Sequence, residues 1–245
     1  MRSLLLASTL LLAGGSALAA NDAATGHTFD STWRVEIDAS GKVTALEQET
    51  KVKPTLADPI EKAISKWTFD PGRVDGQPVA TETTLYLTTL LEARDEGYAI
   101  RVESASTGGA RDHMVAPTFP QAILRRVAGR PYAGLAVVLV TYDANGKVLT
   151  AEPVADVPQS DRALGRSAAN AIKRWTFRPE MVGGHGVAAS VYVPVCYQLE
   201  GSVTAMPSCP QWSPPDSHRS VDAAAGLVSL DPAAKLRDDV IGKML

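Results

Sequence analysis

The chain has 245 residues with 27 acidic and 24 basic side chains, which leaves a formal charge of −3. This balance, without a long run of one sign, is ordinary for an exported protein and argues against a nucleic-acid partner. Beyond the amino terminus, no segment is long and apolar enough to span a membrane.

The amino terminus has the features of a secretory signal peptide, which we predict over residues 1–20. Arg2 precedes the apolar run Leu4–Leu12, and an Ala-x-Ala cleavage site follows at Ala17–Ala19. The competing interpretation is an uncleaved membrane anchor. A spanning helix needs roughly 20 apolar residues, however, and Gly14-Gly15 interrupts this shorter run. We therefore expect a protein that does not span the membrane after signal cleavage.

A sequence block in this chain occurs twice. Ala63–Pro71 recurs as Ala171–Pro179 at an offset of 108 positions. Upstream, Asp38–Val43 recurs as Asp143–Val148 at an offset of 105 positions. The sequence therefore predicts a duplicated module, with a first, degenerate copy over residues 27–105 and a second, more complete copy over 112–201.

Each copy has the pattern of strand, turn, strand, helix and strand. Trp33–Asp38 alternates apolar and polar residues, as a half-buried strand does. Asp58 before Pro59 offers a helix start in the first copy, and Ser160 or Asp161 can cap the helix of the second. We predict an α+β fold in which each β-β-α-β copy forms a small antiparallel sheet with the helix packed on one face.

Aromatic residues close each predicted helix. Because they end an apolar helical stripe, we predict that they belong to the core and do not form a ligand site. The prolines after them stop the helix, and a glycine turn precedes the final strand. These motif positions are Trp67, Phe69, Pro71 and Gly76 in the first copy, and Trp175, Phe177, Pro179 and Gly184 in the second.

Cys196 and Cys209 are the only two cysteines. An even pair in an oxidising compartment predicts a disulfide, for which loop entropy alone gives about 3 kcal/mol. Two buried free thiols or a metal pair are the alternatives. The histidines form no short-range pair that would favour a metal, and we predict neither metal nor cofactor.

Residues 202–245 form a proline-rich tail of different character. Trp212 lies among several prolines, and Asp231-Pro232 predicts a short carboxyl-terminal helix. The tail either packs on the second copy through Cys209 or serves as a partner arm. Between the two copies, Glu92–Ala116 is interpreted as a short mixed connection.

The ordered set of motifs resembles the TonB C-terminal domain family. It comprises Gly-Lys-Val after a strand, a helix that closes on Trp-x-Phe-x-Pro, a glycine turn and a final strand. In the second copy, Pro117–Ala122 also resembles the Pro-x-Tyr-Pro segment that opens the family's domain, with Phe119 in place of tyrosine. The first copy has no such segment.

The resemblance implies a periplasmic domain that binds partners by β-strand addition, in which an extended peptide pairs with a sheet edge. We assign this role to the final strand of the second copy, where Pro194 is typical of an edge. The alternative is that this strand pairs internally, with the tail or with the other copy. The predicted edge residues are Val187, Val191, Tyr192, Val193 and Val195.

The expected partners are envelope proteins, including peptides of outer-membrane transporters. A transducer of this family has a long proline-rich spacer, and its absence here argues against energised transport by this chain alone. One alternative is a structural scaffold whose copies pair with each other or form a homodimer. The other is an enzyme with a cleft between the copies, although no catalytic signature supports it. We therefore expect no enzymatic activity.

Overall fold

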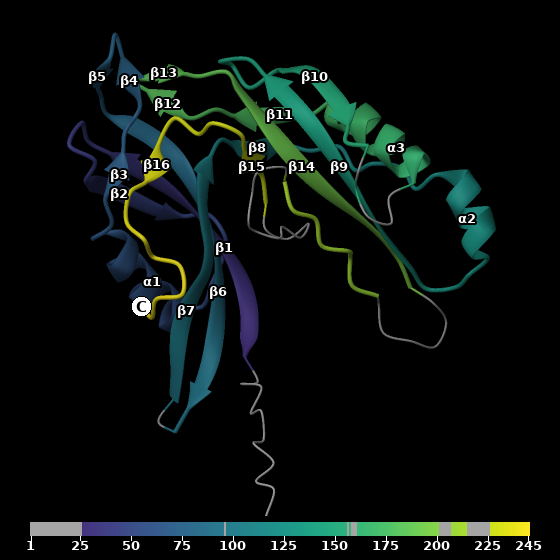
Figure 1. Cartoon of the computed structure of the whole chain (residues 1–245), viewed down its shortest axis with the longest axis horizontal. Helices are drawn as coiled ribbons and strands as arrows, with labels where there is room; N and C mark the ends of the chain where they lie inside the picture. The colour runs from purple at the N-terminus through teal and green to yellow at the C-terminus, as the bar shows by residue number, and fades with distance from the viewer. Residues whose placement is uncertain (1–25, 96, 156, 158–160, 201–206, 215–225) are drawn as a thin grey trace, which may run out of the picture.

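The computed structural model describes residues 26–95, 97–155, 157, 161–200, 207–214 and 226–245. Within these residues the protein is α+β and forms two lobes that lie side by side (Figure 1). We call residues 26–108 the first lobe, residues 110–199 the second lobe and residues 226–245 the tail strap. The predicted signal peptide, residues 1–20, lies outside the described residues. No helix in the described part of the chain is long and apolar enough to cross a membrane.

The first lobe is a sheet with one helix on its inner face. Its elements are β1 (His27–Ile37), β2 (Val43–Gln48), α1 (Pro54–Ile64), β3 (Phe69–Asp70), β4 (Arg73–Val74), β5 (Gln77–Pro78), β6 (Thr81–Arg94) and β7 (Gly97–Gly108). β6 is central, because it pairs antiparallel with β1 on one side and with β7 on the other. Alternate residues of β1, among them Trp33 and Val35, bury their side chains against Ile60 and Ile64 of α1.

The second lobe also has a sheet with a helix packed on one face, and it contains an additional helix. Its elements are β8 (Ala110–His113), α2 (Gln121–Val127), β9 (Tyr132–Tyr142), β10 (Val148–Pro153), α3 (Arg162–Ile172), β11 (Thr176–Arg178), β12 (Met181–Val182), β13 (His185–Gly186) and β14 (Ala189–Leu199). The sheet order is β10-β9-β14-β15, where β15 (Val228–Ser229) comes from the tail strap. One face packs on α3 through Leu164 and Ile172, and the other face is covered by Trp212.

The same hydrogen bonds close the first turn of both lobes. The Asp38 carboxylate accepts from the backbone N–H groups of Ser40 and Lys42, at 2.8 and 3.0 Å. In the second lobe, Asp143 accepts from the corresponding groups of Asn145 and Lys147, both at 2.9 Å. Local side-chain bonding of this kind is what makes Asp favourable at a turn.

A glycine in each turn also bonds to the phenylalanine that lies two residues after the motif tryptophan. The Phe69 N–H donates to the carbonyl of Gly41 and the Phe177 N–H to that of Gly146, at 2.9 and 2.8 Å. Both glycines have positive φ, and a Cβ on either would meet a phenylalanine carbonyl oxygen at 2.0 Å or less. The turn therefore requires glycine in both lobes.

The two helices begin differently. Asp161 caps α3 as predicted, and its carboxylate accepts from the Ala163 N–H at 2.7 Å. The prediction that α1 begins near Asp58 is wrong, because α1 starts at Pro54 and contains Pro59. The fixed φ of Pro54 suits the first helical turn, and burial of Ala57 supports that turn.

The lobes share a sheet edge. β12 of the second lobe pairs antiparallel with the start of β6, Met181 opposite Glu82 and Val182 opposite Thr81. β12 therefore pairs with β6 on the same side as β7, next to the point where β7 ends at Gly108. The connection Glu92–Ala116, interpreted above as a short linker, is therefore mostly strand. It forms the end of β6, all of β7 and β8.

The tail strap joins both lobes, and the predicted carboxyl-terminal helix does not form. Leu236 in β16 (Lys235–Leu236) pairs with Phe69, and Ala234 is buried in the first-lobe core. Farther on, the N–H groups of Gly242 and Leu245 donate to the carbonyls of β7. The helix prediction was wrong because these residues bond to β3, to β7 and to the Glu180 carboxylate, and helical coiling would withdraw them from those contacts.

Candidate protein-binding edge

The predicted partner-binding strand, β14, pairs with β9 along its whole length, from Ala189 opposite Tyr142 to Leu199 opposite Tyr132. The direction in which the backbone groups of β14 point can be derived from the hydrogen bonds between β9 and β10. Val137 of β9 accepts from the Val154 N–H at 2.8 Å, so its backbone groups point toward β10. Pro194 lies opposite Val137, and its backbone carbonyl therefore points away from β9.

Backbone groups alternate along a strand, so every second residue of β14 faces outward. The outward residues are Ser190, Tyr192, Pro194, Cys196 and Gln198. The carbonyl of Ser190 accepts from the Leu230 N–H at 3.0 Å, which agrees with this assignment. Pro194 has no N–H to donate, and an outward position is where a strand tolerates it.

The tail strap covers only the beginning of this outer edge. β15 pairs antiparallel with β14 at two positions, Ser229 with Val191 and Val228 with Tyr192. From Pro194 to Gln198, no described residue makes a backbone hydrogen bond to the outward groups of β14. This stretch, which we call the open edge (residues 194–198), is a row of backbone donors and acceptors that no described residue pairs.

The side chains predicted at this edge divide between the two faces of the sheet. Val191 and Val193 are fully buried against α3, with Val195 half-buried beside them. Tyr192 lies on the opposite face, with its ring 5.0 Å from that of Trp212 in an edge-to-face contact. Val187 lies before the strand, where its N–H donates to the Glu180 carbonyl at 3.0 Å. The alternative, in which the strand pairs internally with the tail, thus holds at Val191 and Tyr192, which are not free for a partner strand.

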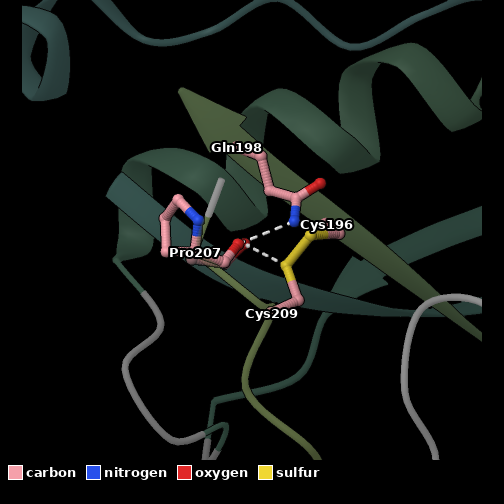
Figure 2. The surroundings of a disulfide bond; sticks show 5 residues. Cys196, Gln198, Pro207 and Cys209 are labelled. Carbon is pink, nitrogen blue, oxygen red and sulfur yellow. Dashed lines mark hydrogen bonds between the residues drawn. A yellow bond between two sulfur atoms is a disulfide. The ribbon is translucent and has the colours of Figure 1, made fainter. Parts of the chain in front are cut away.

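The predicted disulfide between Cys196 and Cys209 is present, beside the open edge (Figure 2). The side chain of Gln198 donates to the carbonyl of Pro207 at 2.8 Å and holds the same segment. Residues 207–214 thereby bring Trp212 onto the sheet face opposite α3, where it packs on Leu135 and Val137. The disulfide therefore holds residues 207–214 on that face.

The aromatic motif residues are core residues, as predicted. Phe69 and Phe177 are buried, as are Trp67 and Trp175. Trp175 also donates its indole N–H to the carbonyl of Val115 at 2.8 Å. Of the other motif positions, Pro71 is buried, Pro179 is half-buried, and Gly76 and Gly184 are turn residues with positive φ.

Glu180 was missed by the sequence reasoning and connects three parts of the molecule. It is 2% exposed, and its carboxylate accepts from the Thr83 hydroxyl at 2.6 Å and from the N–H groups of Ala233 and Ala234 at 2.7 and 3.2 Å. Burial raises the pKa of Glu180 above its ordinary value, although these hydrogen bonds oppose the change. The sequence did contain a signal, because Glu180 differs from Gly72, the residue at the corresponding position of the first recurring block.

Polar residues also fill the junction between the lobes. Arg178 pairs with Glu49 of the first lobe at 2.5 Å. Arg111 lies over the ring of Trp175, 6.0 Å from its centroid, and burial lowers the pKa of its guanidinium. The Tyr86 hydroxyl donates to the carbonyl of Gly109 at 2.8 Å. Within the described residues, no three potential metal ligands come together.

A match to a protein-family model lies within the second lobe. Residues 116–199 match the family model described as Gram-negative bacterial TonB protein C-terminal, so the chain contains a TonB C-terminal domain. This match begins before α2 and ends with β14, and therefore includes the open edge. No curated protein and no solved structure matches the chain.

Proposed function

We propose that this protein is a periplasmic binding module that accepts an extended peptide of an envelope protein at the open edge of β14. The observation that carries the proposal is the row of outward backbone groups between Pro194 and Gln198, which no described residue pairs. An added strand would hydrogen-bond to the carbonyl of Pro194 and to both backbone groups of Cys196 and Gln198. Peptides of outer-membrane transporters are the partners that the TonB C-terminal family favours.

We further propose that the first lobe is a second, degenerate copy of the same domain. The recurring motif blocks and the matching turn hydrogen bonds of Asp38 and Asp143 support this. The copies differ at the corresponding edge. The outer side of β6 is paired with β7 from Thr84 to Arg94, and the start of the strand pairs with β12. The first copy would then have a structural role and the second a binding role.

The chain is proposed to act by binding and to be exported through the amino-terminal signal. Two polar contacts between the lobes, those of Glu180 and Arg178, join structural elements to one another. A catalytic site needs groups that reach a substrate, and neither side chain is free to do so. A scaffold is the second candidate function, and the shared sheet edge between β12 and β6 favours it.

In-cell photo-crosslinking separates the two functions. A photoreactive amino acid replaces Gln198 at the open edge, and a matched variant carries it at Glu103 of β7, whose outer side the tail strap covers near Val102. We expect an adduct with an outer-membrane transporter from position 198 and none from position 103. The adduct should disappear when the transporter lacks its amino-terminal periplasmic peptide. Adducts only between copies of this chain, or equal adducts from both positions, would reject peptide capture in favour of a scaffold.

A further inference from the structure

The solvent face of α3 carries charges of one sign. Its exposed residues at four-residue spacing are Arg162, Arg166, Asn170 and Arg174, the last just beyond the helix end. Residues spaced by four lie in one row along a helix. Neither Arg166 nor Arg174 forms an ion pair with a described residue. Because the whole chain has a charge of −3, this basic row is not a reflection of overall composition.

A groove runs beside this row. It has a volume of about 440 Å³ and is bounded by α3 on one side and by the segment before α2 on the other. Phe119, Pro120 and Ala171 provide apolar walls, and Arg166 and Arg174 stand along one rim. Among the described residues, none that lines the groove is acidic. The hydroxyl of Ser167 bonds to the carbonyl of Thr118 and holds the two sides together.

The corresponding helix of the first lobe provides an internal comparison. The exposed residues of α1 include Asp58 and Glu61 together with Lys62, so that surface has mixed sign. Mixed charge is the usual composition of a solvated helix. The uniform charge of α3 therefore distinguishes this helix from its counterpart within the same chain.

We propose that the α3 groove binds an acidic extended peptide. Arg166 and Arg174 are eight residues apart, about 12 Å along a helix, which matches two residues four positions apart in an extended chain, about 13 Å. Two carboxylates at that spacing could each pair with one guanidinium. A membrane surface fits less well, because it would require exposed bulky apolar residues on the helix. None of the exposed large apolar side chains in the described chain belongs to α2 or α3.

Fluorescence anisotropy with the full exported chain tests this inference. The probe is a labelled ten-residue peptide of Thr and Val with two Glu residues four positions apart, and the control probe has Gln at both positions. The variant Arg166→Gln/Arg174→Gln should bind the Glu probe about fivefold to tenfold more weakly than the wild type does. The matched variant Lys62→Gln/Lys66→Gln removes two exposed charges from the first lobe and should leave binding unchanged.

Three results would overturn the inference. The first is equal binding of the Gln probe, and the second is an equal loss in the two variants, which would indicate a general charge effect. The third is failure to bind the Glu probe combined with Arg166- and Arg174-dependent binding to vesicles of anionic phospholipid, which would indicate a lipid surface. The groove does not depend on β14, so the crosslink from position 198 should persist in the arginine variant. In the wild type, absence of binding of the Glu probe with a retained crosslink would show that the groove proposal has failed. Absence of the crosslink with retained binding of the Glu probe would show that the open-edge proposal has failed.

Discussion

The final strands of the two lobes, β6 and β14, hold comparable places in their sheets but differ in what covers their outer side. β7 pairs with β6 over eleven positions, from Thr84 to Arg94. The tail strap pairs with β14 at Val191 and Tyr192 and adds one hydrogen bond to the carbonyl of Ser190. Similar strand–helix units can therefore present very different edges. The chain that follows each unit decides how much of its last strand remains available.

The largest effect is expected in the cores, where the two lobes are alike. Replacing either Trp67 or Trp175 with Ala should cost about 3–5 kcal/mol, a large part of a total stability of about 5–15 kcal/mol. Chemical denaturation measures both. The Trp175→Phe change should cost more than Trp67→Phe, because of these two tryptophans only Trp175 donates its indole N–H to a described residue. An unchanged melting temperature for either Ala variant would contradict its core position.

Loss of the disulfide should have the next largest effect, and this bond belongs to the second lobe alone. The double variant Cys196→Ser/Cys209→Ser should lose about 2–3 kcal/mol, since the crosslink restricts the unfolded chain. Denaturation with and without a thiol reductant gives the measurement. Reductant should destabilise the wild type but not the variant. If both proteins respond equally, the loss does not come from this bond.

Glu180 should produce a smaller, pH-dependent effect at the junction of the lobes. Burial raises its pKa in the folded protein above the unfolded value, so the folded state binds the proton more strongly. The stability from this group is greatest in acid and decreases as pH rises above about 4.5, through the folded pKa. The melting temperature of the wild type relative to Glu180→Gln should therefore fall from pH 4.5 toward neutrality. The exposed Glu152→Gln variant serves as the control for the substitution itself.

Amide hydrogen exchange tests the open edge without changing stability. In β14, the N–H groups of Cys196 and Gln198 should exchange much faster than those of Val195 and Tyr197, which face β9. In β6, both sets should be protected because strands lie on both sides. Addition of a bound peptide should slow the outward amides of β14. Uniform protection along free β14 would show that its edge is already occupied.

Local sequence patterns predicted the elements that local chemistry specifies. The turns at Asp38 and Asp143, the Asp161 cap and the buried aromatic motif all form where the residues indicate. Each depends on neighbours close in the chain or on one apolar helix face. The strand β7 was missed because its alternation is weak and its surroundings contain glycine. It forms because β6 and the tail strap offer paired backbone groups on both of its sides.

The sequence by itself thus determined the strand–helix units, their aromatic cores and the pairing of Cys196 with Cys209. These features depend on periodicity, on turn chemistry and on there being only two cysteines. Only the tertiary structure decided which edge remains open and where Glu180 is buried. Both depend on contacts between residues distant in sequence, such as Ser190 with Leu230 and Glu180 with Ala233. A local pattern contains no information about which distant strand satisfies a backbone group, because every strand offers the same donors and acceptors.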